Sequence, residues 1–374
     1  MRRHCRGNFK KGSTVVFLSL IIASVVGAAI VFVIHAKKTA EVSYQRILTE
    51  LACRSVLSEY DVRLKQDYGI FAFRGDGRFV SDMVQYYLDY TGTKSQVMFS
   101  LSNMSVSSDI KGFEIVSLEN FEKQIIDAAK HNFFIRKGID RVDSSLGHKA
   151  ELKNEAVIEN LPSFGFTKKN FEIDFSDLTA TDLKGLIAGA GNTFFINSYI
   201  FSVFQCRTIQ YEEKKSFFEY EIEYLLAGLF SDTGNLEKVR GYLVNLRTPV
   251  NIAKIYADPV RAQKALAEAE LIAPGPGAPA AQLAIITKWA REDAGKEADE
   301  LLNGGKVDGL SYKEYLMIFL SLQDRETKLL RIMDLIQINL RYSYYDHFLL
   351  QEHFCGFYLE TELNGRRASY VHTY

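Results

Sequence analysis

The chain has 374 residues and a globular composition, with 47% hydrophobic and 24% charged residues. These values exclude an intrinsically disordered chain and indicate a protein that buries a sizeable core. The formal net charge of −1 falls to −6 once the five positive charges of the first twelve residues are set aside. Because nucleic-acid binding requires a basic face, this balance argues against a nucleic-acid partner.

A short basic segment precedes a long apolar one at the N-terminus. Residues 1–12 contain no acid, and the 22 residues from Ser13 to Ile34 carry no formal charge. At about 1.5 Å per residue, a helix of this length spans the roughly 30 Å hydrocarbon core of a bilayer. Fewer positive charges follow the segment than precede it, which places the N-terminus in the cytoplasm. We therefore predict a cytoplasmic leader (1–12), a membrane helix (13–35) and an extracellular remainder, in a single-pass protein of the cell membrane.

The membrane helix is expected to continue into a stalk helix, 36–66, because no Gly or Pro interrupts it before residue 66 and apolar residues recur there at helical spacing. Within the membrane segment, Ser19, Ala23 and Gly27 lie four residues apart. Such a row of small residues allows a second helix to approach closely. The alternative is that these are ordinary small residues of a membrane helix.

Residues 67–230 are predicted to form the first part of an α+β ectodomain. Gly69 suits the left-handed cap of a short helix, and the loosely alternating stretch 104–116 indicates a strand. Ser117 then fits the N-cap of a helix that reaches about residue 134. The uncharged stretch 185–206 contains polar side chains and glycines, so we expect a buried helix of the ectodomain rather than a second membrane span.

Strict alternation predicts a strand over 217–226. Aromatic residues and Ile222 alternate there with Glu219, Glu221 and Glu223, which places the carboxylates together on a solvent-facing side of a sheet. Three carboxylates in a row can also gather a cation, but no nearby His or Asp supports that interpretation.

Residues 231–345 are predicted to form a helical bundle. Pro249 is expected to separate two helices, Asp258 to cap the next one, and Ser311 with Glu314 to form a capping box. The predicted helices are 235–246, 250–256, 259–272, 280–302, 311–322 and one that carries Leu329 to Leu340, with a loop at 274–279.

The C-terminal segment, 346–374, is predicted to be a β-hairpin, because Asn364-Gly365 separates two β-prone runs. We expect one antiparallel sheet with the helices 232–341 inserted between its second and third strands; its strands lie near 104–116, 217–226, 353–363 and 366–374. The predicted fold class is α+β: an N-terminal transmembrane helix that continues into a long stalk helix, then an ectodomain with an antiparallel sheet and a large helical insertion.

No catalytic motif is present in the sequence: phosphate loops, GxSxG and HExxH are all absent. His347 and His353 are six residues apart, too far around a helix to share a metal. Cys206 and Cys355 can form one disulfide or remain buried free thiols. The tripeptide that starts at Arg74, Arg-Gly-Asp, is predicted to be a turn rather than an adhesion ligand. We therefore predict a non-enzymatic protein with no cofactor, no metal and no small-molecule substrate.

Several stretches together resemble a known family. They are RGNFKKGSTVVFLSL, SVLSEYDVRLKQDYGIFAF, FEYEIEYLLAG leading into NLEKVRGYLVNLRTPVNIAKIYADP, and GLSYKEYLMIFLSL with LLRIMDLIQINLR. They are similar to an uncharacterised membrane-anchored family that occurs in Gram-positive bacteria alongside Flp/Tad (tight-adherence) pilus genes. That family resembles TadE/TadG-like pseudopilins in its leader and N-terminal helix. The resemblance implies a minor pilin or a pilus-associated envelope component.

The N-terminal segment also has the layout of a prepilin leader, in which a peptidase cuts after a Gly that directly precedes the apolar helix. Cleavage would fall between Gly12 and Ser13. The usual pilin pattern has Glu five residues after the cut, where this chain has Phe17, so cleavage remains open.

We expect the protein to assemble through its N-terminal helix with other pilin-like or Tad proteins and to present an extracellular interaction domain. The alternative is a permanently membrane-anchored extracellular sensor or surface-binding receptor. An extracellular hydrolase is a third reading, which would need a nucleophile and a base to converge in a pocket.

Overall fold

The computed structural model describes residues 11–94, 104–131, 155–163, 185, 191–211, 215–363 and 366–374. These parts of the chain are mainly helical with small antiparallel sheets, which confirms the predicted α+β class. Their contacts form two compact units, each built from separate stretches of sequence. Unit 1 comprises Met1–Glu59, Asp76–Asp109 and Phe357–Thr373, and unit 2 comprises Tyr60–Gly75, Ile110–Gly356 and Tyr374.

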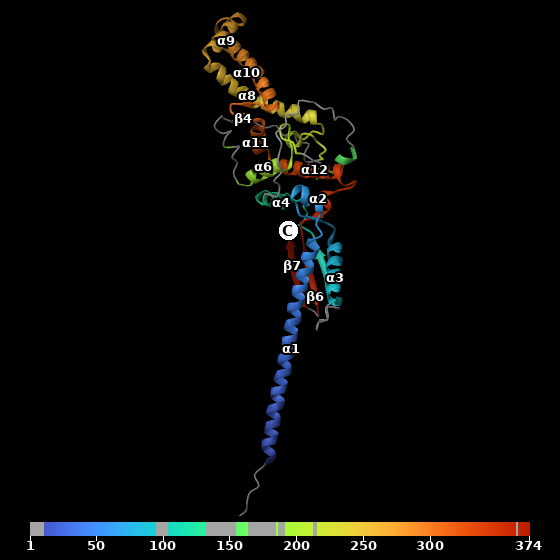
Figure 1. The fold of residues 1–374 in the computed structure, drawn as a ribbon. Coiled ribbons are helices and arrows are strands. Elements are labelled where there is room, and N and C mark those ends of the chain that lie inside the picture. Colours follow the sequence, from blue (N-terminus) through green and yellow to red (C-terminus); the bar gives the residue numbers. More distant parts are fainter. Residues whose placement is uncertain are drawn as a thin grey trace, which may run out of the picture. The chain divides into compact units, whose positions relative to one another are not determined.

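Unit 1 is organised around one long helix, α1 (Lys11–Leu57) (Figure 1). At 1.5 Å per residue, its 47 residues extend for about 70 Å. Residues 14–40 are exposed throughout, whereas Leu48, Ala52 and Val56 are buried. Because these three lie four residues apart, one stripe of the second half of the helix faces the rest of the unit.

The buried stripe of α1 belongs to a small α+β layer. The helix contacts α3 (Gly77–Lys94) and strand β7 (Arg366–Thr373). The sheet has the strand order β2–β6–β7, and β2 (Ser105–Asp109) is antiparallel to β6 (Gly356–Leu363) with Ser105 opposite Glu362. The two predicted C-terminal strands are therefore confirmed as neighbours, while the strand predicted over 104–116 is shorter than expected.

The predicted stalk helix is interrupted. Helix α1 ends at Leu57, and a separate helix, α2 (Val62–Tyr68), begins after Asp61, whose carboxylate accepts a hydrogen bond from the Leu64 N–H at 2.8 Å. An N-cap of this kind starts a new helix without any Gly or Pro. The absence of Gly and Pro, on which the prediction relied, therefore does not ensure that the helix continues. Gly69 ends α2 with a φ of 66°, as predicted.

Unit 2 is organised around helix α12 (Arg325–Ser343), which is buried along most of its length although it carries many polar residues. Arg331 donates hydrogen bonds to the carbonyls of Leu225 and Leu226, and Asn339 accepts one from the Phe217 N–H. Buried polar groups are tolerated when each has a partner. Here the partners lie in the helix Glu221–Ala227 and in the segment just before it, so the side chains of the central helix fix both of these neighbouring segments.

Several helices surround α12. It contacts α2, α4 (Leu118–Lys130), α7 (Glu221–Ala227) and the 3-10 turn η1 (Glu155–Ile158). Helix α6 (Gly191–Val203) packs on α4 and on α11 (Tyr312–Leu322). The expectation of a buried helix within 185–206 is confirmed, since Ile196, Tyr199 and Ile200 of α6 are buried.

The strand predicted over 217–226 is wrong. Glu221–Ala227 form helix α7, and all seven of its residues are buried. Alternation of apolar and acidic residues predicts a strand only when one side of the segment faces water. Here Glu221 and Glu223 are buried in a helix, so the described sheet lacks this strand and the helical insertion lies between β2 and β6.

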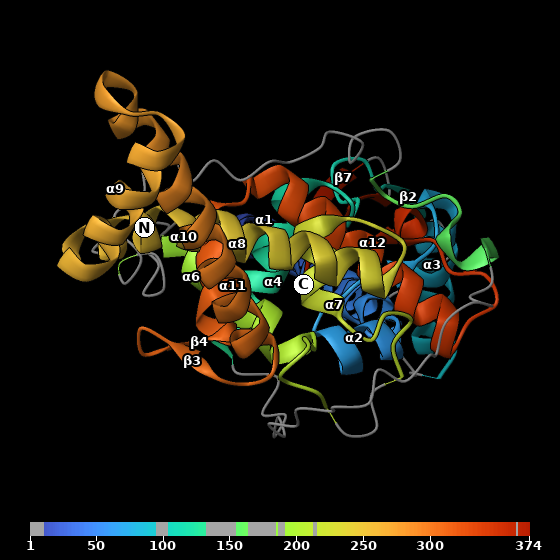
Figure 2. The same cartoon turned by 90° about the horizontal axis from the view of Figure 1, so that it is seen from above.

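Helices α8 (Asp232–Ala257), α9 (Pro259–Ile272) and α10 (Ala278–Leu302) follow one another. Helix α10 lies along α8, and α9 packs against both, to form what we call the arm (Figure 2). The outer part of the arm has its own small core, which consists of Ile255, Ala265, Ile286 and Ala290.

Pro249 lies inside α8, so the predicted break between 235–246 and 250–256 is wrong. A proline in a helix interior costs about 3 kcal/mol. The packing of α8 along α10 offsets this cost, which local sequence does not show. The predicted caps are confirmed: Asp258 accepts from the N–H groups of Val260 and Arg261, and Ser311 with Glu314 forms a capping box.

The remaining elements are short. They are β1 (Phe73–Arg74), β3 (Lys306–Val307), β4 (Leu310–Ser311), β5 (His353–Phe354), η2 (Gly275–Gly277) and η3 (Leu350–Glu352). Strand β1 pairs with β5, and β3 pairs with β4. Cys53, Cys206 and Cys355 are buried free thiols, so the second alternative for Cys206 and Cys355 is correct.

Candidate functional site

The residues predicted for leader cleavage and for helix packing all lie on α1. Gly12 and Ser13 fall in its first turn, and residues 1–10 lie outside the described chain. Ser19, Ala23 and Gly27 are exposed, and a Cβ built on Gly27 would meet no atom within 4 Å. The Ser19 hydroxyl donates to a backbone carbonyl of its own helix at 2.7 Å, so it needs no further partner. We call the row Ser19, Ala23 and Gly27 the low strip, because its small side chains leave space for a second helix to approach closely.

One helix in the described part of the chain, Thr14–Leu57, is long and apolar enough to cross a membrane. Its apolar portion coincides with the predicted segment 13–35. The prediction of a single N-terminal membrane helix is therefore supported by length and composition.

Two acidic residues predicted to face solvent are instead completely buried. The carboxylate of Glu221 accepts hydrogen bonds from the Gln205 N–H at 2.8 Å and from the Asn339 side chain at 2.7 Å. The carboxylate of Glu223 accepts from the Arg207 N–H and from the Tyr312 hydroxyl, both at 2.9 Å. These contacts attach the loop after α6 to α7, α11 and α12, which is a structural task rather than a cation site.

Glu223 is the less satisfied of the two. Its second oxygen, Oε2, is buried and has no hydrogen-bond partner among the described residues. Burial raises the pKa of Glu223 to about 7. We therefore expect this side chain to titrate near neutral pH, with the proton on the oxygen that has no partner.

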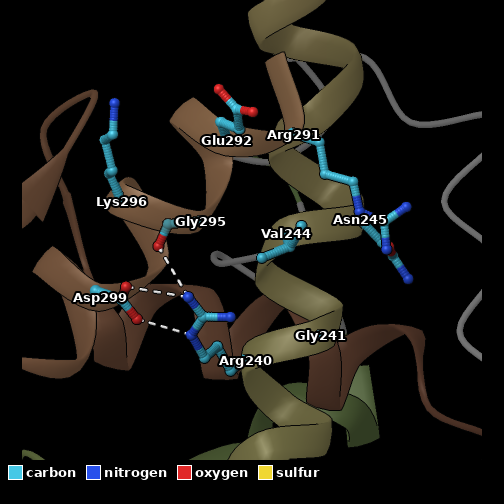
Figure 3. A pocket seen from close by; sticks show the side chains of 9 residues that line it. All are labelled: Arg240, Gly241, Val244, Asn245, Arg291, Glu292, Gly295, Lys296 and Asp299. Carbon is cyan, nitrogen blue, oxygen red and sulfur yellow. Dashed lines mark hydrogen bonds and ion pairs between the residues drawn. The ribbon is translucent and has the colours of Figure 1, made fainter. Parts of the chain in front are cut away.

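The surface between α8 and α10 contains an open groove of about 620 Å³ (Figure 3). Arg240 reaches from α8 to the carboxylate of Asp299 on α10, with Nε–Oδ1 2.7 Å and Nη2–Oδ2 3.0 Å. Arg291 and Lys296 line the same groove, and Glu292 lies beside them. The charges of both signs alternate here, so the groove has no single-sign field that would select an anionic or a cationic ligand.

Deeper in the arm, one arginine joins three elements. Arg247, whose side chain is 3% exposed, forms ion pairs with Glu297 of α10 and with Asp308 in the β3–β4 turn, at 2.8 and 2.6 Å. Lys254 pairs with the same Asp308 at 2.8 Å. Hydrogen bonding to both carboxylates maintains the charge of this guanidinium despite its burial. The sequence gives no sign of this network, because its members lie up to 61 residues apart.

The outer end of the arm is uncharged and apolar. Residues 271–287 contain no charged side chain. Val260, Leu271 and Ile272 are exposed by 76%, 86% and 72%. Leu271 and Ile272 are neighbours in this uncharged segment, and adjacent exposed apolar side chains are typical of an interaction surface.

The Arg-Gly-Asp tripeptide and His353, which are weak functional signals in the sequence, make structural contacts. Arg74 forms an ion pair with Glu352 at 2.6 Å, and Asp76 accepts a hydrogen bond from the Phe79 N–H at 2.7 Å. His353 is buried, and its Nε2 lies 3.8 Å from Asp61 Oδ2. In the described ranges no group of three or more His, Cys, Asp or Glu residues is arranged to hold a metal ion.

The fold and these sites define an α+β protein with one N-terminal helix that can cross a membrane and a largely helical second unit. A model described as a family of unknown function (DUF5702) matches residues 147–308 and 307–365, which together cover more than half of the chain. The chain belongs to this family. No curated protein and no solved structure matches it.

Proposed function

We propose that this protein is a non-enzymatic, minor pilin-like component of a Flp/Tad-type pilus or secretion apparatus. In this proposal its N-terminus is cytoplasmic and the rest of the chain beyond the membrane helix is extracellular. The observation that supports it most is the division of α1: residues 14–40 are exposed, while Leu48 to Val56 form part of a folded core. Such a helix can leave lipid and join a bundle of like helices while the ectodomain stays folded.

Helix packing along Ser19, Ala23 and Gly27 would provide the assembly contact. Because hydrocarbon gives apolar helices no net hydrophobic drive to associate, close packing at small residues supplies the attraction. The strip is open along its whole length in the described structure, with space for a partner backbone at Gly27.

The apolar end of the arm would contact another protein of the assembly. The residues around it do not favour an anionic lipid surface, since Arg261 is paired with Asp293 at 2.8 Å and Glu270 is exposed nearby. A protein surface with apolar pockets for Leu271 and Ile272 is a better match.

The first experiment is the intact mass and N-terminal sequence of the protein from native membranes, compared with those from a strain that lacks prepilin peptidase. A terminus at Ser13 that disappears in the mutant strain would support the pilin pathway. An uncut terminus at Met1 or Arg2 in both strains would refute it and favour the anchored receptor.

The second experiment tests helix packing with Gly27→Leu, which fills the low strip. We expect cross-linked assemblies to be lost while the ectodomain keeps its circular dichroism spectrum and thermal midpoint. Val25→Leu is the matched control, because it adds bulk to the opposite side of the same helix. Equal assembly in both variants would contradict the role of the strip.

A further inference from the structure

A small cavity in unit 2 lies where α11 ends and α12 begins. It has a volume of about 310 Å³, at the lower end of the range for small-molecule sites. Its lining is almost entirely polar: Glu122 comes from α4, Asn192 and Thr193 from α6, Ser321 from α11, and Arg325 and Lys328 from α12. Neither the proposed assembly contact on α1 nor the arm involves this cavity.

Lys328 is the unusual member of this lining. Its side chain is 3% exposed, and its ammonium group has one acceptor among the described residues, Asn197 Oδ1 at 3.3 Å. An ammonium group has three N–H donors, so two of them remain available. No described carboxylate lies within ion-pair distance of this lysine. A buried ammonium without a counter-ion is costly, and burial lowers the pKa of Lys328 to about 8.

The other charges at the cavity are already balanced. Arg325 forms an ion pair with Glu122, and Glu122 also accepts a hydrogen bond from the Asn192 amide at 3.4 Å. The neighbouring acid, Asp324, accepts from the Thr327 N–H at 2.9 Å as the N-cap of α12. Lys328 therefore contributes the one positive charge of this lining that lacks an anionic partner.

We propose that this cavity binds a small polar monocarboxylate, whose carboxylate contacts the ammonium group of Lys328. A single negative charge matches the single unbalanced positive charge. A dianion such as a phosphate monoester would bring a second negative charge that no unpaired cation of this lining balances. The hydroxyl and amide groups of Thr193, Ser321 and Asn192 can bond the hydroxyl or amino groups of such an acid.

The test uses the full-length protein in detergent micelles and isothermal titration calorimetry. L-lactate and D-glycerate are the probes, lactamide is the uncharged analogue of lactate, and inorganic sulfate is the dianionic competitor. We expect saturable binding of at least one acid at pH 7. Lactamide and sulfate should bind at least tenfold more weakly. Absence of binding by both acids, or equal binding of lactamide or sulfate, would overturn the proposal.

Lys328→Met should weaken acid binding at least tenfold, while Lys288→Met, which removes an exposed lysine of α10, should leave it unchanged. Unchanged binding in Lys328→Met would overturn the assignment. If Lys328→Met fails to fold, the pH dependence of the wild-type protein decides the question. Above pH 8, affinity should fall by about tenfold per pH unit as the ammonium loses its proton. Affinity that stays constant up to pH 10 would exclude Lys328 as the contact.

Discussion

Asp334, on the central helix α12, accepts hydrogen bonds from both the backbone N–H and the hydroxyl of Ser163, with 2.9 Å between the Ser163 nitrogen and Asp334 Oδ1. The two residues are 171 positions apart in the chain. This contact fastens the segment around η1 to the core of unit 2.

Ser163→Ala removes the hydroxyl donor and keeps the backbone one. Burial raises the pKa of Asp334 to about 6, while the two hydrogen bonds favour its ionised form. At pH 4.5, which lies below the pKa of the folded chain, the buried carboxyl holds a proton, so its ionised form contributes little there. Above pH 6 the folded chain must hold a buried carboxylate that has lost a donor. We expect a loss of about 1–2 kcal/mol at pH 7.5 and a smaller loss at pH 4.5, measured by urea unfolding.

The matched control is Ser343→Ala, whose exposed hydroxyl donates to the Lys215 carbonyl. It should change stability by less than about 0.5 kcal/mol at both pH values. A pH-independent loss in Ser163→Ala would contradict the role of the ionised carboxylate.

Glu223→Gln imitates the protonated form of a buried acid. The pKa of Glu223 is raised above its ordinary value, so the folded chain retains a proton that the unfolded chain releases between about pH 4.5 and pH 7. Stability is therefore lost as pH rises through this window, and the glutamine variant avoids the loss. We expect the variant to be more stable than the wild type by about 1–3 kcal/mol at pH 8, with little difference at pH 4.5. Urea unfolding at the two pH values measures both quantities.

Glu221→Gln is the contrasting variant, because both oxygens of Glu221 accept hydrogen bonds. Its amide would place a donor against a donor, so it should lose about 1–3 kcal/mol at pH 8. Stabilisation by Glu221→Gln as well would show that the unpartnered oxygen of Glu223 is not the cause.

Gly228 ends α7 with a φ of 72°, and a Cβ built there would lie 2.7 Å from Nη2 of Arg331. Gly228→Ala therefore combines backbone strain with displacement of a buried guanidinium that binds the carbonyls of α7. We expect a loss of about 2–4 kcal/mol in the free energy of unfolding.

Gly241→Ala serves as the control, since it lies within α8 and a Cβ there meets no atom within 4 Å. It should stabilise the protein by up to about 1 kcal/mol, because alanine has the higher helix propensity. Both values come from chemical unfolding, and equal effects of the two variants would refute the steric argument.

Two arginines of α8, seven residues apart, provide a test of burial. Arg247→Ala removes a buried guanidinium from Glu297 and Asp308, which keep Lys254 as a partner, and we expect a loss of about 2–3 kcal/mol. Arg240→Ala breaks an exposed pair with Asp299 and should cost about 0–1 kcal/mol. Thermal unfolding at two salt concentrations measures the loss of stability in each variant. The loss in Arg240→Ala should depend more strongly on salt, because the exposed pair is screened more. A similar loss in both variants would show that burial does not determine the strength of these pairs.

Local sequence determined the elements whose signals are themselves local. The apolar segment 13–35, the caps at Asp258 and Ser311, the left-handed Gly69 and the two C-terminal strands all follow from side-chain chemistry within a few residues. Charge, length and turn residues act over that same short range, so the fold class and the membrane helix could be read without coordinates.

Only the tertiary structure determined the conformation and burial of segments whose sequence signals were ambiguous. The sequence pattern predicts that Glu221 and Glu223 form the polar side of a strand. In the structure both are buried in a helix, where N–H and hydroxyl donors from other segments bond their carboxylates. Pro249 predicts a break between two helices, but α8 continues through it because α8 packs along α10. The partners of Arg247, Asp334 and Lys328 likewise come from remote positions. Sequence periodicity reports whether a side chain is polar, but burial of a polar group depends on a partner that only the folded chain provides.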